Sequence, residues 1–90
     1  MKTLQELRAE IDDIDEQMTS LFVKRMEAVT EIGKIKKSQG LPVQNRQREE
    51  QILEARAKQV SCELTESVKE FYEAVFAVSR SYQQKELISK

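Results

Sequence analysis

A run of heptad spacing through the first third of the sequence constrains this chain more than any other feature. Ten residues recur at alternating intervals of three and four positions, and nine of them are apolar. They are Leu4, Leu7, Ile11, Ile14, Met18, Leu21, Arg25, Ala28, Ile32 and Ile35. Such spacing aligns one seam along a helix, so it predicts a single continuous helix over about residues 3–38. Gly40 and Pro42 end it, because glycine suits a helix C-cap and proline cannot continue a helix.

Two shorter helices are expected after this break. Asn45 can cap a helix over about residues 46–59, and Thr65 can cap another over about residues 66–87. The first of these has a thin apolar stripe, whereas the last carries a full apolar face: Val68, Phe71, Tyr72, Val75, Phe76, Val78 and Tyr82. No segment alternates in the manner of a strand. We therefore expect an all-α fold of one long and two shorter helices, in a single domain spanning residues 1–90.

The length of the first helix bears on the assembly of the chain. At about 1.5 Å per residue, the helix would extend for about 50 Å. A compact globule of 90 residues has a radius of gyration of about 12 Å, hence a diameter of about 30 Å. The helix would therefore protrude from its own chain with an exposed apolar seam. A two-fold homodimer in which the long helices pair is the simplest remedy, and a bent or broken helix is the alternative.

The composition excludes several classes of chemistry. The chain has no histidine and a single cysteine, Cys62, so zinc sites and histidine-based catalysis are not expected. No glycine-rich nucleotide loop is present, and 15 basic residues nearly balance 16 acidic ones, which gives no reason to expect a nucleic-acid partner. No segment is apolar enough to span a membrane, and a lone cysteine fits the reducing cytoplasm. Any catalysis would use arginine, lysine, glutamate, glutamine and serine, without metal or cofactor, for electrostatic stabilisation.

Arg25 is the anomaly in the heptad seam. An unpaired buried guanidinium costs several kcal/mol, so Arg25 must meet a carboxylate, a ligand or water. It shares one stripe of the helix with Val29, Ile32 and Lys36, and the two cations are about 16 Å apart along the axis, close enough to converge on a small anion. Gly33, beside this stripe, could admit a close neighbour or simply be tolerated. A buried ion pair, or a polar residue that sets the register of the seam, is the alternative for Arg25.

Other polar residues are placed where they could complete such a pocket. The expected second helix begins with Asn45, Arg48 and Glu49. A helix N-terminus favours anions, although an ordinary solvated first turn would have the same sequence. Ser79 and Gln83 lie one turn apart and continue the apolar face of the last helix, unless that end of the helix frays.

Arg8 lies at an e position of the same heptad, about 25 Å before Arg25 along one helix. The two arginines cannot hold one small ligand within a single chain. If a dimer pairs the long helices antiparallel, Arg8 of one chain approaches Arg25 and Lys36 of the other. A surface arginine near helix acids is the alternative.

Several motifs follow one another along the chain. They are Leu7-Arg8-x-x-Ile11-Asp12-x-Ile14-Asp15, Arg25, Ile32-Gly33-Lys34-x-Lys36, Pro42-Val43-x-Asn45-x-x-Arg48-Glu49 and Ser79-x-x-x-Gln83. In this order and spacing they closely resemble the all-helical chorismate mutases, over residues 4–83. The resemblance implies an intertwined homodimer of three-helix protomers with two active sites built from both chains. It also implies conversion of chorismate to prephenate, in aromatic amino acid biosynthesis.

The same resemblance implies roles for residues of this chain. Arg25 and Arg8 of the partner subunit would hold the two carboxylates of chorismate. Lys36 and Gln83 would donate hydrogen bonds to the ether oxygen, where negative charge develops as the C–O bond breaks. Glu49 would accept a hydrogen bond from the ring hydroxyl.

Three further residues would complete the pocket in the family's pattern. Arg48 and the main chain of Asn45 would shape the wall that carries Glu49, and Ser79 would assist a carboxylate. The family often has aspartate where this chain has Asn45. Because asparagine also caps a helix, a main-chain contact would survive this change, whereas a contact that needs the charge would not.

Two other functions stay open on these residues. An isochorismate-pyruvate lyase on the same fold has a similar cationic pocket, although the Arg48-Glu49 pair and the position of Lys36 favour the mutase. The other is a non-catalytic helical dimerisation or regulatory module, which could pair with a separate shikimate-pathway enzyme. Such a module would not need the full set of charged and amide residues named above.

Overall fold

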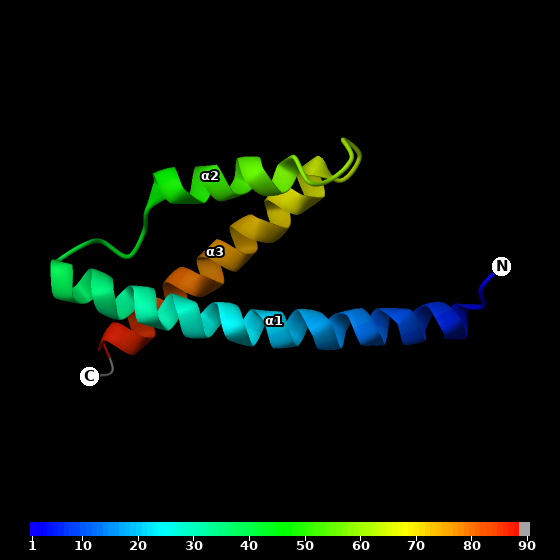
Figure 1. The fold of residues 1–90 in the computed structure, drawn as a ribbon, viewed down its shortest axis with the longest axis horizontal. Helices are drawn as coiled ribbons and strands as arrows, with labels where there is room; N and C mark the ends of the chain where they lie inside the picture. The colour runs from blue at the N-terminus through cyan, green and yellow to red at the C-terminus, as the bar shows by residue number, and fades with distance from the viewer. Residues whose placement is uncertain (89–90) are drawn as a thin grey trace.

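The computed structural model describes residues 1–88 of the chain and contains three helices in that range. They are α1 (Leu4–Gln39), α2 (Arg46–Ala57) and α3 (Thr65–Ile88) (Figure 1). No strand occurs among these residues. The predicted all-α fold, with one long and two shorter helices, is confirmed.

Both ends of α1 are capped, and the sequence predicts the cap at Gly40. The Thr3 side chain accepts a hydrogen bond from the backbone N–H of Glu6 at 3.1 Å, which satisfies one of the free donors of the first turn. Gly40 has a φ of 68°, in the left-handed region that glycine enters without steric cost. The N–H of Leu41 then bonds to the carbonyl of Lys36 at 2.8 Å. The helix is continuous between these caps, so the alternative of a broken first helix is wrong.

α2 begins where it was expected and ends slightly early. The Asn45 side chain accepts a hydrogen bond from the backbone N–H of Arg48 at 3.1 Å, which confirms the predicted N-cap. The helix ends at Ala57 rather than near residue 59. The N–H of Gln59 bonds to the carbonyl of Arg56 at 3.1 Å, a tighter spacing than that of an α-helix, and this turn closes the element.

The start of α3 departs from the prediction. Thr65 is the first helical residue, not the N-cap. The N–H of Leu64 bonds to the carbonyl of Ser61 at 3.0 Å, and the carbonyl of Leu64 accepts from the N–H of Val68 at 2.9 Å. A turn therefore leads directly into the helix, and the Thr65 hydroxyl donates back to the Ser61 carbonyl instead of capping.

α3 packs against both of the other helices. It contacts both α1 and α2, whereas no Cα atom of α1 lies within 8 Å of one in α2 among the described residues. In Figure 1, α3 crosses from the end of α2 to the C-terminal half of α1. The core is small, and its buried apolar side chains are Met26, Val29 and Phe76. The relative placement of α1 and α2 therefore depends on α3.

The N-terminal half of α1 extends away from the rest of the chain (Figure 1). Every side chain from residue 1 to residue 24 is exposed. The exposed set includes the apolar seam of this half: Leu4, Leu7, Ile11, Ile14, Met18 and Leu21. The chain measures 55 × 28 × 14 Å, so the predicted protrusion of α1 is confirmed. No helix in the part of the chain that the structure describes has the length and apolar character needed to cross a membrane.

Candidate active site

The Arg25 side chain extends from the heptad seam of α1 to α3. It is half-buried, and its Nη1 donates a hydrogen bond to the Ser79 hydroxyl at 2.7 Å. The same hydroxyl donates to the carbonyl of Val75 at 2.8 Å, which fixes its orientation. No carboxylate pairs with Arg25 among the described residues, so the alternative of an ion pair within the chain is not found. A guanidinium has five N–H donors, and most of those of Arg25 are left for an anion.

Gln83 lies one turn beyond Ser79 on α3 and is also buried, with 6% of its surface exposed. Its Nε2 donates to the carbonyl of Val29 at 2.9 Å. The side chain lies against Gly33 of α1, where an added methyl group would be 3.4 Å from Cγ of Gln83, an ordinary van der Waals contact. The fraying alternative for this end of α3 is wrong up to Gln83, and Gln83 is the neighbour of Gly33. An amide NH2 has two donors, of which one stays for a ligand.

The floor between the two cations of α1 differs from the predicted stripe in one residue. Val29 is buried as expected, but Ile32 is 47% exposed. Gly33 is buried instead, because α3 covers the adjacent arc of the helix. Ile32 therefore stays on the rim of this face in the single chain.

Lys36 marks the other end of the stripe, near the loop that joins α1 to α2. It is half-buried, and its Nζ donates to the carbonyl of Val43 at 2.6 Å. An ammonium has three donors, so this bond leaves donors for a ligand. Asn45 and Arg48 follow at the start of α2, where both side chains are exposed. The Asn45 side chain caps the helix, which leaves its main chain to contact a ligand.

Glu49 has a partner that the sequence did not indicate. Its Oε2 accepts a hydrogen bond from Nη1 of Arg80, at 2.5 Å, and both side chains are partly buried. This ion pair joins the first turn of α2 to α3, so a solvated first turn is the wrong description of Glu49. Arg80 carries no sequence signal of its own, because one cation on the polar side of an amphipathic helix looks like a solvated residue.

Arg8 is not brought to these residues within the chain. It lies on the exposed N-terminal half of α1, about 25 Å from the level of Arg25 along the same continuous helix. The expectation that Arg8 serves the site of a partner subunit stays a prediction.

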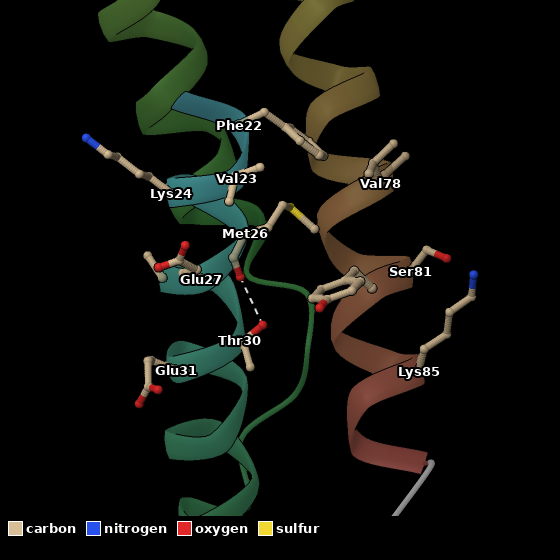
Figure 2. Close-up of a pocket in the computed structure, with 13 residues that line it drawn as sticks. Phe22, Val23, Lys24, Met26, Glu27, Thr30, Glu31, Val78, Ser81 and Lys85 are labelled. Carbon is tan, nitrogen blue, oxygen red and sulfur yellow. Dashed lines mark hydrogen bonds between the residues drawn. The ribbon is translucent and has the colours of Figure 1, made fainter. Parts of the chain in front are cut away.

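A different face of the α1–α3 pair carries an open groove of about 1250 Å³ (Figure 2). Phe22 and Met26 point from α1 toward α3, Lys24 and Glu27 lie on the α1 side of the groove, and Val78 belongs to its α3 side. None of the predicted site residues lines this groove. It is therefore an apolar surface apart from the polar cluster of Arg25, Ser79 and Gln83.

Known proteins resemble the chain in sequence and in fold. It is 40% identical to the T-protein of Haemophilus influenzae, over 76% of this chain and 19% of that protein. It is 43% identical to a bifunctional chorismate mutase/prephenate dehydratase of Aquifex aeolicus, over 60% of this chain and 15% of that protein. The chain thus spans about a fifth or less of these curated relatives.

A solved structure and a family model cover nearly the whole chain. A conserved hypothetical protein from Pyrococcus furiosus is 40% identical, with a TM-score of 0.76 over 92% of this chain and 97% of that one. The model of the family "chorismate mutase type II" matches residues 7–84. The resemblance expected from the motifs is thereby confirmed, and the chain belongs to the type II chorismate mutase family.

Proposed function

We propose that this chain is a chorismate mutase, which converts chorismate to prephenate in aromatic amino acid biosynthesis. The observation that carries the proposal is the placement of Arg25 in a chain of this family. Arg25 is a half-buried cation whose partner is the neutral hydroxyl of Ser79, beside the buried amide of Gln83. Such a cation, held in place but not neutralised, is suited to bind a carboxylate of a small substrate.

The reaction needs little beyond these residues. In the Claisen rearrangement, the C–O bond of the ether breaks and a C–C bond forms within one molecule, so no proton transfer and no cofactor is required. The enzyme must hold a compact conformer and stabilise the negative charge that develops on the ether oxygen. In this proposal Lys36 and Gln83 donate to that oxygen, each using a donor beyond those bound to Val43 and Val29.

The first turn of α2 forms the opposite wall in this proposal. Glu49 accepts a hydrogen bond from the ring hydroxyl, while Arg48 and the main chain of Asn45 line the wall beside it. Because the Asn45 side chain already caps α2 through the N–H of Arg48, its contribution to a ligand comes from the backbone. Asparagine in place of the family's usual aspartate is then expected to cost little.

The complete site requires a second copy of the chain, in an intertwined homodimer. The exposed apolar seam of α1 is a regular heptad, which is the pattern that pairs helices. Antiparallel pairing brings Arg8 of the partner subunit toward Arg25, where it supplies the second carboxylate-binding cation. A lone chain would hold only one of the two arginines at each site.

The test is the purified chain with chorismate, followed by the loss of ultraviolet absorbance and by identification of the product. We expect prephenate. Incubation with isochorismate is the matched comparison, since pyruvate release without any prephenate from chorismate would identify the lyase instead. A chain inert toward both substrates would point to the regulatory module, and to a search for a shikimate-pathway enzyme whose activity it alters.

A further inference from the structure

Arg80 follows Ser79 directly on α3 but serves a different helix. Its Nη1 bonds to Oε2 of Glu49 on α2 at 2.5 Å, with 32% of the Arg80 side chain and 21% of the Glu49 side chain exposed. The pair of Lys34 and Glu31, at 3.9 Å on the surface of α1, is of another kind. Exposed pairs of that sort contribute little, whereas a shielded bridge between two helices constrains both.

The two walls of the proposed site belong to helices whose backbones are not adjacent. Glu49 belongs to α2 and Lys36 to α1, and α3 contacts both helices while their Cα atoms stay more than 8 Å apart in the described residues. The distance from one wall to the other is therefore set by α3 and by the loop between α1 and α2. Arg80 lies at that junction, because it lines a hollow of about 440 Å³ together with Val43 and Gln44 of the loop.

A short stretch of α3 thus divides its polar side chains between the two walls. Ser79 and Gln83 bond to Arg25 and Val29 on α1. Arg80 is displaced by one residue, about 100° around the helix axis, and points to α2. Because these residues belong to one helix, α3 fixes the positions of the two walls relative to each other.

The geometry of the bond leaves Glu49 able to bind a ligand. A carboxylate offers two oxygens and about four acceptor positions. Arg80 takes Oε2, so Oε1 keeps its capacity to accept a hydrogen bond from a hydroxyl group. A glutamate at the start of a helix, with three side-chain torsions, would otherwise sample several rotamers.

We propose that Arg80 is a positioning residue, which holds the Glu49 carboxylate in one orientation so that Oε1 can accept the substrate's hydroxyl. This inference rests on the proposed function of the chain. Arg80 acts through Glu49 and does not touch the substrate. The class of ligand that depends on it is a dicarboxylate bearing a ring hydroxyl.

The test is a double-mutant cycle with Arg80→Gln, Glu49→Gln and the double variant, measured as kcat and KM for chorismate. Arg80→Gln should lower kcat/KM by about tenfold to a hundredfold, because misplacing a positioned group by about 1 Å costs up to that amount. The loss should be divided between kcat and KM in the same way as the loss caused by Glu49→Gln. In the Glu49→Gln background, the second substitution should cost less than about threefold, since coupled residues do not add. Lys34→Gln, which removes the cation of a surface pair, should leave both constants unchanged.

Arg80→Lys keeps a charge with a single donor group and should fall between the wild type and Arg80→Gln. It replaces Arg80→Gln in the cycle if the latter loses its helical circular dichroism. Additive losses in the double variant would assign Arg80 a direct contact with substrate, and an Arg80→Gln enzyme with wild-type constants would deny it any role; either result overturns the proposal. If the wild type leaves chorismate unchanged, the proposed function itself fails, together with the role of Arg80 in it.

Discussion

The two halves of α1 share one helix and one heptad but have opposite surroundings. In the N-terminal half every side chain is exposed, including the whole apolar seam. In the C-terminal half α3 covers one face, where Met26, Val29 and Gly33 are buried and Arg25 finds a hydroxyl partner. Arg25 therefore interrupts the seam in the half that α3 contacts. The apolar seam residues stay exposed in both halves, at Ile32 and Ile35 as in the N-terminal half.

One helix can thus present a surface for assembly in one half and residues of a binding site in the other. A regular apolar seam left in water is unfavourable, at roughly 25 cal/mol for each Å² of apolar surface, so the proposed pairing with a second chain would stabilise the N-terminal half. The C-terminal half replaces one seam residue with Arg25, whose guanidinium bonds to Ser79 on α3 of the same chain and keeps further donors. Substitutions in the N-terminal half should therefore affect assembly, and substitutions in the C-terminal half should affect the chemistry.

The largest effect is expected from charging the bare half. Ile11→Asp combined with Met18→Asp places two carboxylates on the seam, where pairing would bury them without partners. Sedimentation should show the mass of a single chain, and turnover of chorismate should fall by at least about a hundredfold, because Arg8 of the partner subunit is lost. Leu64→Asp alters an equally exposed leucine outside the seam and should change neither measurement. A double variant that stays dimeric would show that the seam is not the interface.

Arg25→Ala should remove the chemistry and spare the assembly. The substitution deletes the cation that is proposed to hold a substrate carboxylate, so kcat/KM should fall by about a hundredfold or more. The dimer should survive, because alanine fits a heptad seam and no buried charge is stranded. Lys34→Ala is the control for removal of an exposed cation from the same helix. An Arg25→Ala protein that is both inactive and monomeric would instead favour the register-setting role.

Subunit mixing tests whether the two halves of α1 meet across the dimer. Arg8→Ala and Arg25→Ala should each be inactive alone. After exchange in equal amounts, about half of the dimers are mixed and each has one intact site, so activity should recover to about a quarter of wild type. Mass spectrometry of the intact dimers would verify the exchange. Mixed dimers without activity would mean that Arg8 and Arg25 do not share a site.

The smallest effects are expected from two glycines, Gly33 inside α1 and Gly40 at its C-cap, which make a matched pair. Gly33→Ala adds a methyl group at 3.4 Å from Cγ of Gln83, while the helix gains up to about 1 kcal/mol. Gly40→Ala puts a side chain at a φ of 68°, at a cost of about 1 kcal/mol or more. Thermal unfolding at one protein concentration should thus move by a few degrees, upward for Gly33→Ala and downward for Gly40→Ala. An equal decrease of the unfolding temperature in both variants would mean that the Gln83 side chain cannot shift to accommodate a methyl group at Gly33.

Much of the fold could be read from local signals. The heptad and the capping chemistry of Gly40 and Asn45 depend on residues within a few positions of one another, and these predictions are confirmed. The start of α3 is an exception. Threonine is a common N-cap residue, but a turn that begins at Ser61 leads directly into the helix, so Thr65 is its first residue and not its cap. The candidate site followed from the anomaly at Arg25 and from the family's motifs, whose roles stay predictions.

What the sequence determined by itself is the set of helices, the seam and the polar residues that interrupt it, because periodicity and capping act over one or two turns. Only the tertiary structure decided which groups meet. Ser79 under Arg25, Gln83 against Gly33, and Arg80 beside Glu49 join positions that are 31 to 54 residues apart. Their pairing depends on the direction in which α3 crosses the other two helices, and no local pattern in the chain specifies that direction.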